Sequence, residues 1–167
     1  MTPPETSSRA AGNSARPIRI CGCGNPGRQD DGIGLALVAE LEAWAQAEKF
    51  ADLAFAADYQ FNVEDALAVA ESRAVVFVDA AREGPAPFEF RELAPRKESS
   101  FTTHALAPEA VLALADELYG ARPPAWLLAI RGEAWAPNEA PTAAARAHQN
   151  AAREFLQGWL RGILRGT

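Results

Sequence analysis

Short apolar segments alternate with segments of helical periodicity along most of the chain, and this alternation limits the possible folds more than any other feature. The apolar runs with the length of buried strands are Ile18–Cys23, Leu53–Ala57, Ala74–Val78 and Trp126–Ile130. Apolar residues recur at helical spacing over about 34–49, 62–72, 108–120 and 142–164. Phe88–Leu93 alternates apolar and charged residues, as in a half-exposed strand near a sheet edge. The sequence therefore predicts an α/β domain with three layers, in which helices cover both faces of a mainly parallel five-stranded sheet.

Length and composition predict a single domain without a membrane segment. A chain of 167 residues has room for one core, which we assign to residues 17–167. Residues 1–16 are rich in Ser, Pro and Ala and lack the apolar centre of a secretory signal, so we expect a disordered tail. No apolar run approaches the roughly 20 residues needed to cross a bilayer. We expect a cytoplasmic protein.

The charge pattern argues against a nucleic-acid-binding protein, and the cysteines argue against a disulfide-stabilised one. The formal net charge is -6, and the basic residues are scattered, so the electrostatic footprint of a nucleic-acid-binding protein is absent. Cys21 and Cys23 lie two residues apart in a predicted strand, where a disulfide between them would be badly strained. We expect buried thiols in a reducing compartment. A Cys-x-Cys metal clip is the alternative, but the sequence offers no further soft ligands nearby.

Carboxylates and one histidine follow three of the predicted strands. Asp30 and Asp31 come after the first strand, Asp79 after the third, and His104 after the fourth. In open α/β sheets, ligands bind beyond the carboxyl ends of the strands, so these side chains are candidates for one crevice. An imidazole with carboxylates suits a divalent ion such as nickel or zinc, without choosing between them.

Each of these residues also has a purely structural interpretation. An acidic residue before a helix satisfies free N–H groups, which one member of the Asp30–Asp31 pair would do. Asp79 would serve as a cap for the loop at residues 80–84. The other histidine, His148, falls within the last predicted helix, where a packed or surface side chain is expected.

The segment Gly22–Gly27 (Gly-Cys-Gly-Asn-Pro-Gly) matches the Gly-x-Gly-x-x-Gly fingerprint of dinucleotide-binding folds. That fold needs a helix N-terminus directly after the glycines, facing the pyrophosphate. Here Arg28-Gln29-Asp30-Asp31 delays the helix and places two negative charges where phosphates would lie. A nucleotide-binding oxidoreductase therefore remains an alternative that the acidic pair disfavours.

Three motifs together resemble those of the hydrogenase maturation endopeptidases. The first is Gly24-Asn25-Pro26, a short spacer, and then Asp30-Asp31-Gly32-x-Gly34. The second is the strand Val76–Val78 followed by Asp79-Ala80, and the third is Thr102-Thr103-His104. The similarity extends from about Ile18 to the last helix.

This resemblance implies a twisted, mainly parallel sheet and an endopeptidase that removes the C-terminal extension of a hydrogenase large-subunit precursor after nickel insertion. Asp31, Asp79 and His104 would bind nickel supplied by the precursor, without a tightly held metal of the enzyme's own. Asp31 or Asp79 would also be a candidate general base. The residues implied to contact the substrate are Asn25, Asp30, Tyr59, Gln60 and Thr103.

One segment departs from the family pattern. Many relatives have Asp-Gly-Gly-Thr after the second strand, where this chain has Asp58-Tyr59-Gln60-Phe61-Asn62. Together with Arg131-Gly132-Glu133 after the fifth strand, this form resembles a subgroup that serves other hydrogenase classes.

A module that recognises the metal without cutting the precursor is a further alternative.

Overall fold

The computed structural model describes residues 15–98 and 106–166. Thr103, His104 and most of the expected N-terminal tail lie outside these residues. The elements that follow one another along the chain are β1 (Ile18–Cys23), η1 (Gln29–Gly32, a 3-10 turn), α2 (Ile33–Ala47), β2 (Leu53–Asp58), α3 (Asp65–Ala70), β3 (Ala74–Ala81), β4 (Phe88–Leu93), α4 (Pro108–Tyr119), β5 (Ala125–Arg131) and α5 (Ala143–Arg165).

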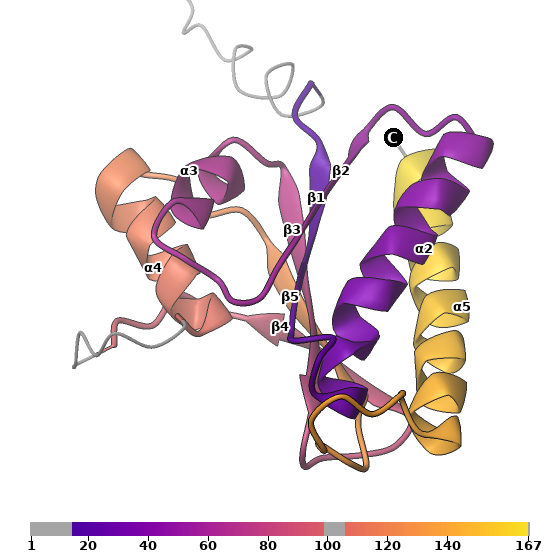
Figure 1. Cartoon of the computed structure of the whole chain (residues 1–167). Helices are drawn as coiled ribbons and strands as arrows, with labels where there is room; N and C mark the ends of the chain where they lie inside the picture. Colours follow the sequence, from indigo (N-terminus) through magenta and orange to yellow (C-terminus); the bar gives the residue numbers. More distant parts are fainter. Residues whose placement is uncertain (1–14, 99–105, 167) are drawn as a thin grey trace, which may run out of the picture.

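The described strands form one sheet in the order β2-β1-β3-β5-β4. The pairs β2–β1, β1–β3 and β3–β5 are parallel, and β4 runs antiparallel to β5. Helices α2 and α5 cover one face of the sheet, and α3 and α4 cover the other (Figure 1). The predicted three-layer architecture is confirmed.

Alternation of side chains along the strands builds one apolar layer on each face. From β1 and β3, Ile20 and Val76 pack towards α2 and α5, whereas Cys21 and Phe77 pack towards α3 and α4. Both cysteines are free and buried, as expected. The central strands are therefore apolar on both faces, which is why they have continuous apolar sequences.

The structure differs from the sequence prediction around the two predicted aspartate motifs. The third strand does not end before Asp79 but continues to Ala81, because its ladder with β5 extends to the pair Ala81–Arg131. Between β1 and α2, the chain forms η1, a short element that the sequence did not predict, and α2 then begins at Ile33, close to the expected start at about residue 34. Asp79 thus lies within the last part of a paired strand, in a fixed position.

None of the helices in residues 15–98 and 106–166 is long and apolar enough to cross a membrane.

Candidate functional site

Asp79 and Cys23 are neighbours at the carboxyl end of the sheet. Cys23 lies one residue beyond the β1–β3 pair Gly22–Val78, which places it beside Asp79. The Cys23 thiol donates a hydrogen bond to the Asp79 carboxylate. Burial raises the pKa of the Cys23 thiol above its ordinary value, and the charge of Asp79 adds to this effect. Cys23 is therefore a neutral hydrogen-bond donor to Asp79 and a poor nucleophile.

The carboxyl group of Asp79 is itself perturbed. Its burial, together with the negative charge of nearby Asp31, raises its pKa from 3.8 to about 6. Hydrogen bonds from the Cys23 thiol and the Ala80 N–H act in the opposite direction but do not cancel this rise. A carboxylate with a raised pKa is a stronger base than an ordinary one, a property common in active sites.

Asp31 reaches this end of the sheet from η1, which lies against β3. Its Oδ2 accepts a hydrogen bond of 2.9 Å from the Asn25 N–H, so the acidic pair and the Gly-Asn motif are joined directly. Its charge acts on both Asp79 and Cys23. The structure thus brings together Asp31 and Asp79, two of the three predicted metal ligands.

Gly24 allows the chain to fold back onto Asp31. Its φ is +145°, and a Cβ at this position would collide with the Asp31 carbonyl oxygen. We expect Gly24→Ala to lower the free energy of unfolding by about 2–4 kcal/mol, because the substitution adds backbone strain and a clash. Gly84→Ala is the matched control, since Gly84 has φ +98° but a Cβ added there would meet no atom within 4 Å. Urea unfolding should show a loss of about 1 kcal/mol in the free energy of unfolding for Gly84→Ala, from backbone strain alone. Equal losses for the two variants would mean that the contact with the Asp31 carbonyl is unimportant.

Asp30 has surroundings quite unlike those of Asp31. It is fully buried, and its Oδ2 accepts from the N–H groups of Glu133 and Ala134 and from the Thr142 hydroxyl. Its Oδ1 accepts from the Thr142 N–H at 2.7 Å. Burial alone would raise the pKa of Asp30, but these hydrogen bonds together lower it below its ordinary value. Asp30 therefore joins η1 to the loop before α5, a structural role that differs from the substrate contact implied by the resemblance.

The loop at 132–142 packs on the segment that holds Asp31 (Figure 1). The Ala136 N–H donates to Gln29 Oε1 at 3.1 Å, and the Asn138 N–H donates to the Gly27 carbonyl at 2.8 Å. The Arg82 guanidinium lies 4.2 Å from the centre of the Trp135 ring. The two hydrogen bonds fix the loop against the β1–α2 connection, and the Arg82 contact fixes it against the segment after β3, so both stabilise the position of Asp31 indirectly.

The remaining predicted site residues are placed less completely. Tyr59 is 65% exposed, Gln60 is also exposed, and the Asn25 side chain accepts from the Gly27 N–H at 2.9 Å. Thr103 and His104 lie outside the described residues. Within the described ranges, no three Cys, Asp, Glu or His side chains are grouped closely enough to hold a metal ion. The predicted three-ligand site therefore stays a prediction, with two ligands located.

Asp58 is a further acidic residue at this end of the sheet that the sequence prediction did not include. It pairs in register with Cys23, so Asp58, Cys23 and Asp79 form a row across β2, β1 and β3. It is exposed, and its Oδ1 accepts from the Tyr59 N–H at 2.6 Å. The signal was available in the sequence, because Asp58 follows a predicted strand just as Asp79 does.

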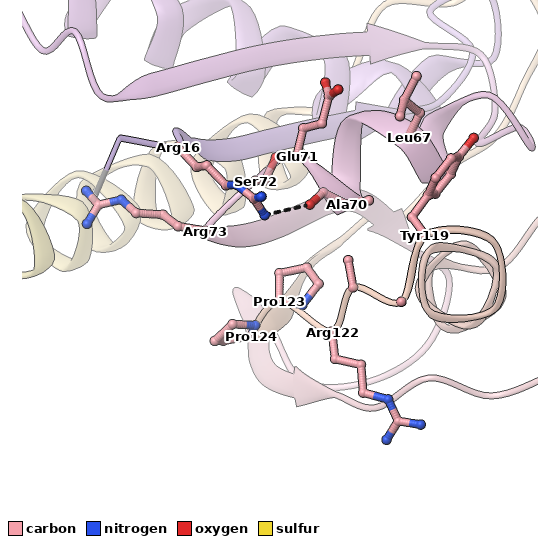
Figure 2. A pocket seen from close by; sticks show the side chains of 12 residues that line it. Arg16, Leu67, Ala70, Glu71, Ser72, Arg73, Tyr119, Arg122, Pro123 and Pro124 are labelled. Carbon is pink, nitrogen blue, oxygen red and sulfur yellow. Dashed lines mark hydrogen bonds between the residues drawn. The ribbon is translucent and has the colours of Figure 1, made fainter. Parts of the chain in front are cut away.

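A groove at the opposite end of the sheet contains several arginines. Its lining includes residues just before β1, β3 and β5, among them Arg16, Arg73 and Pro124. Arg16 donates to the Ala70 carbonyl at 3.3 Å, and Arg122 pairs with Asp116 at 2.7 Å. Figure 2 shows that the arginine head groups point in different directions. They do not converge on one anion, and the groove lies far from the acidic row.

The local structure also bears on the dinucleotide alternative. Helix α2 begins at Ile33, six residues after Gly27, so its N-terminus does not follow the glycines directly. The Asn25 N–H, which would be available to a phosphate in a dinucleotide-binding loop, donates to Asp31. The Asp31 carboxylate thus lies where the phosphate of a dinucleotide would bind to the glycine segment.

Comparison with known proteins shows which solved structures share this fold. No protein-family model and no curated protein sequence matches the chain. Among solved structures, the NiFe hydrogenase maturation protease HycI from Thermococcus kodakarensis is similar with a TM-score of 0.67 and 23% identity over 87% of this chain and 93% of that one. The hydrogenase maturating endopeptidase HybD from Escherichia coli is similar with a TM-score of 0.63 and 20% identity, over 88% and 93%. The chain has the fold of the hydrogenase maturation proteases.

Proposed function

We propose that this protein is an endopeptidase that removes the C-terminal extension of a NiFe hydrogenase large-subunit precursor after nickel has been inserted. The observation that carries the proposal is the proximity of Asp31, on η1, to Asp79, near the end of β3, in a chain with the fold of hydrogenase maturation proteases. The sequence motifs add His104 as a third polar group. We further propose a cytoplasmic location.

In this proposal, nickel is part of the substrate and is not a resident cofactor. Asp31, Asp79 and His104 would bind the ion that the precursor carries, and would leave coordination positions for the precursor's own ligands. Carboxylate and imidazole groups are suitable ligands for nickel. Recognition of the ion would restrict cleavage to precursors in which metal insertion is complete.

The carboxylates would also activate the water that attacks the peptide bond. Cys23 is buried and hydrogen-bonded to Asp79, which argues against a covalent thiol mechanism and favours an aspartic-type reaction. With a pKa of about 6, Asp79 is mostly ionised at neutral pH yet more basic than an ordinary carboxylate. These are the properties required of a general base. Asp31 is the other candidate for this role, since it lies beside the same position.

The experiment compares nickel-loaded and nickel-free precursor with wild-type protein and with Asp31→Asn, Asp79→Asn and His104→Ala. We expect a shortened product only from wild type with the nickel-loaded precursor, and a rate at least about 100-fold lower in each variant, because each removes a ligand or the base. Product mass measured against time gives both the rate and the bond that is cut.

Two matched variants control for loss of charge and of a histidine. Asp52→Asn changes an exposed acid at the opposite end of the sheet, and His148→Ala removes the histidine whose Nδ1 lies 2.7 Å from the Arg131 carbonyl oxygen. Both should process at close to the wild-type rate.

Full activity of all three site variants would contradict the proposal. A stable complex without a shortened product would favour a recognition module, and protection against heat by NAD or FAD would favour nucleotide binding.

A further inference from the structure

Strand β2 is an edge of the sheet, and its outer side is free of pairing. It pairs with β1 on one side, and no other strand in the described part of the chain pairs with it. The helices lie over the two faces of the sheet and leave this edge open (Figure 1). Ala56, Ala57 and Asp58 are exposed. An open strand edge is a template for pairing with another extended chain.

The hydrogen bonds to β1 identify which backbone groups face outwards. The Ile18 N–H donates to the Asp52 carbonyl, and the Gly24 N–H donates to the Asp58 carbonyl. Backbone groups of a parallel strand alternate between its two sides, so even-numbered residues of β2 face β1. The N–H and C=O groups of Leu53, Phe55 and Ala57 therefore point away from the sheet, available to a partner strand.

The edge also lacks the features that usually prevent such pairing. Natural edge strands are protected by Lys, Pro, inward-pointing charges or bulges. Residues 53–57 have the sequence Leu-Ala-Phe-Ala-Ala, without a charge or a proline. The first charge along the strand is Asp58, which lies at the carboxyl end in the acidic row with Cys23 and Asp79. The open edge thus leads directly to the candidate site.

We propose that the outer edge of β2 binds the precursor's C-terminal extension as an added antiparallel strand. This inference rests on the proposed function. Strand addition recognises an extended peptide through its backbone, largely independently of its side chains. The six residues Leu53–Asp58 span roughly 20 Å, enough to order about six residues of a peptide.

The position of the site sets the direction of the added strand. The bond to be cut must lie near Asp31 and Asp79, at the carboxyl end of β2. The extension follows that bond in the precursor and has a free end, so it runs from the site back along β2 towards Leu53. A peptide in that direction is antiparallel to β2. The small side chains of Ala56 and Ala57 leave room for the residues nearest the bond.

The test places proline on each edge of the sheet. Ala57→Pro removes an outward N–H beside the site and leaves the hydrogen bonds between β2 and β1 intact. Proline is tolerated at such positions of an edge strand. Glu92→Pro is the matched control on the other edge: the Arg131 N–H donates to the Pro87 carbonyl, so the alternation in β4 directs the exposed Glu92 N–H outwards. We expect kcat/KM for the nickel-loaded precursor to fall about tenfold or more in Ala57→Pro, and less than about twofold in Glu92→Pro.

Hydrogen exchange on the wild-type protein gives a second, independent measurement. The amide protons of Phe55 and Ala57 should exchange rapidly in the free protein and become protected when the nickel-loaded precursor is added. If wild type cuts the precursor while these amides stay unprotected, or while Ala57→Pro cuts it at the wild-type rate, the edge inference is wrong and the proposed function stands. If wild type neither cuts nor binds the precursor, both are wrong.

Discussion

Replacement of Asp79 with asparagine should make the protein more stable at neutral pH and, under the proposed function, inactive. The folded protein holds this half-buried carboxylate near the charge of Asp31, and desolvation together with that charge raises its pKa from 3.8 to about 6. The gap between these values corresponds to about 3 kcal/mol of folding free energy that the charged form loses. Asparagine has no charge and retains an oxygen that can accept from Cys23 and Ala80. We expect a gain of about 1–3 kcal/mol at pH 7.

The pH dependence gives this prediction a definite sign. An acid whose pKa is raised by folding binds its proton more tightly in the folded protein, so protonation at low pH favours folding. The stability of the wild-type protein should therefore fall as the pH rises from about 4 to about 6, as far as Asp79 determines it. The advantage of Asp79→Asn should be fully present above pH 6 and absent below about pH 4.

Urea unfolding of wild type and Asp79→Asn at several pH values measures this difference directly. Asp52→Asn is the control for removal of an acid, because Asp52 is exposed at the opposite end of the sheet. A variant less stable than wild type at pH 7 would mean that the Asp79 carboxylate is favourable in the folded state. In the processing assay the same variant should be inactive, which would separate the function of Asp79 from any role in stability.

Much of the fold could be predicted because its signals are local. Ala74–Val78 is continuously apolar since the strand is covered on both faces, and Phe88–Leu93 alternates because β4 lies at an edge. The end of β3 could not be predicted locally. Asp79, Ala80 and Ala81 remain in the strand because β5 provides partners for them, and that pairing joins segments about fifty residues apart.

The candidate site shows the same limit. Asp31 and Asp79 could be placed together at the carboxyl end of the sheet, because both follow strands of a predicted parallel sheet. Apart from the family resemblance, the local sequence does not distinguish Asp30 from Asp31, since adjacent acids before a helix have the same local context. Their difference arises from the loop at 132–142, whose N–H groups are distant in sequence and surround only Asp30. Asp58 could have been predicted in the same way as Asp79, because it also directly follows a predicted strand.

Asp30→Ala should therefore be among the most destabilising single substitutions in the chain, in contrast to its neighbour. It would remove four hydrogen bonds from a fully buried carboxylate and leave the N–H groups of Glu133, Ala134 and Thr142 without their acceptor. We expect a loss of about 3–5 kcal/mol, because buried donors are left unpaired. This corresponds to a fall in Tm of about 10 °C for a domain of this size.

The effect should begin at the start of α5. The Thr142 side chain caps this helix by accepting from the Ala145 N–H at 3.1 Å, and it also donates to Asp30. Loss of Asp30 would free Thr142, so amide exchange should accelerate first around residues 142–146. A variant in which only the distant end of α5 exchanged faster would contradict this mechanism.

Asp31→Ala is the matched control, since it removes the adjacent carboxylate, to which the structure assigns one hydrogen bond, from the Asn25 N–H. We expect it to lose about 1 kcal/mol or less and to abolish processing. Acid should also weaken the contribution of Asp30 to stability. Because hydrogen bonds lower the pKa of Asp30, its contribution is present above the ordinary carboxyl pKa and is lost only as the pH falls through its lowered value, opposite to Asp79. Equal losses of stability for Asp30→Ala and Asp31→Ala would mean that the acidic pair acts as one structural unit, and the division between a structural and a functional aspartate would be wrong.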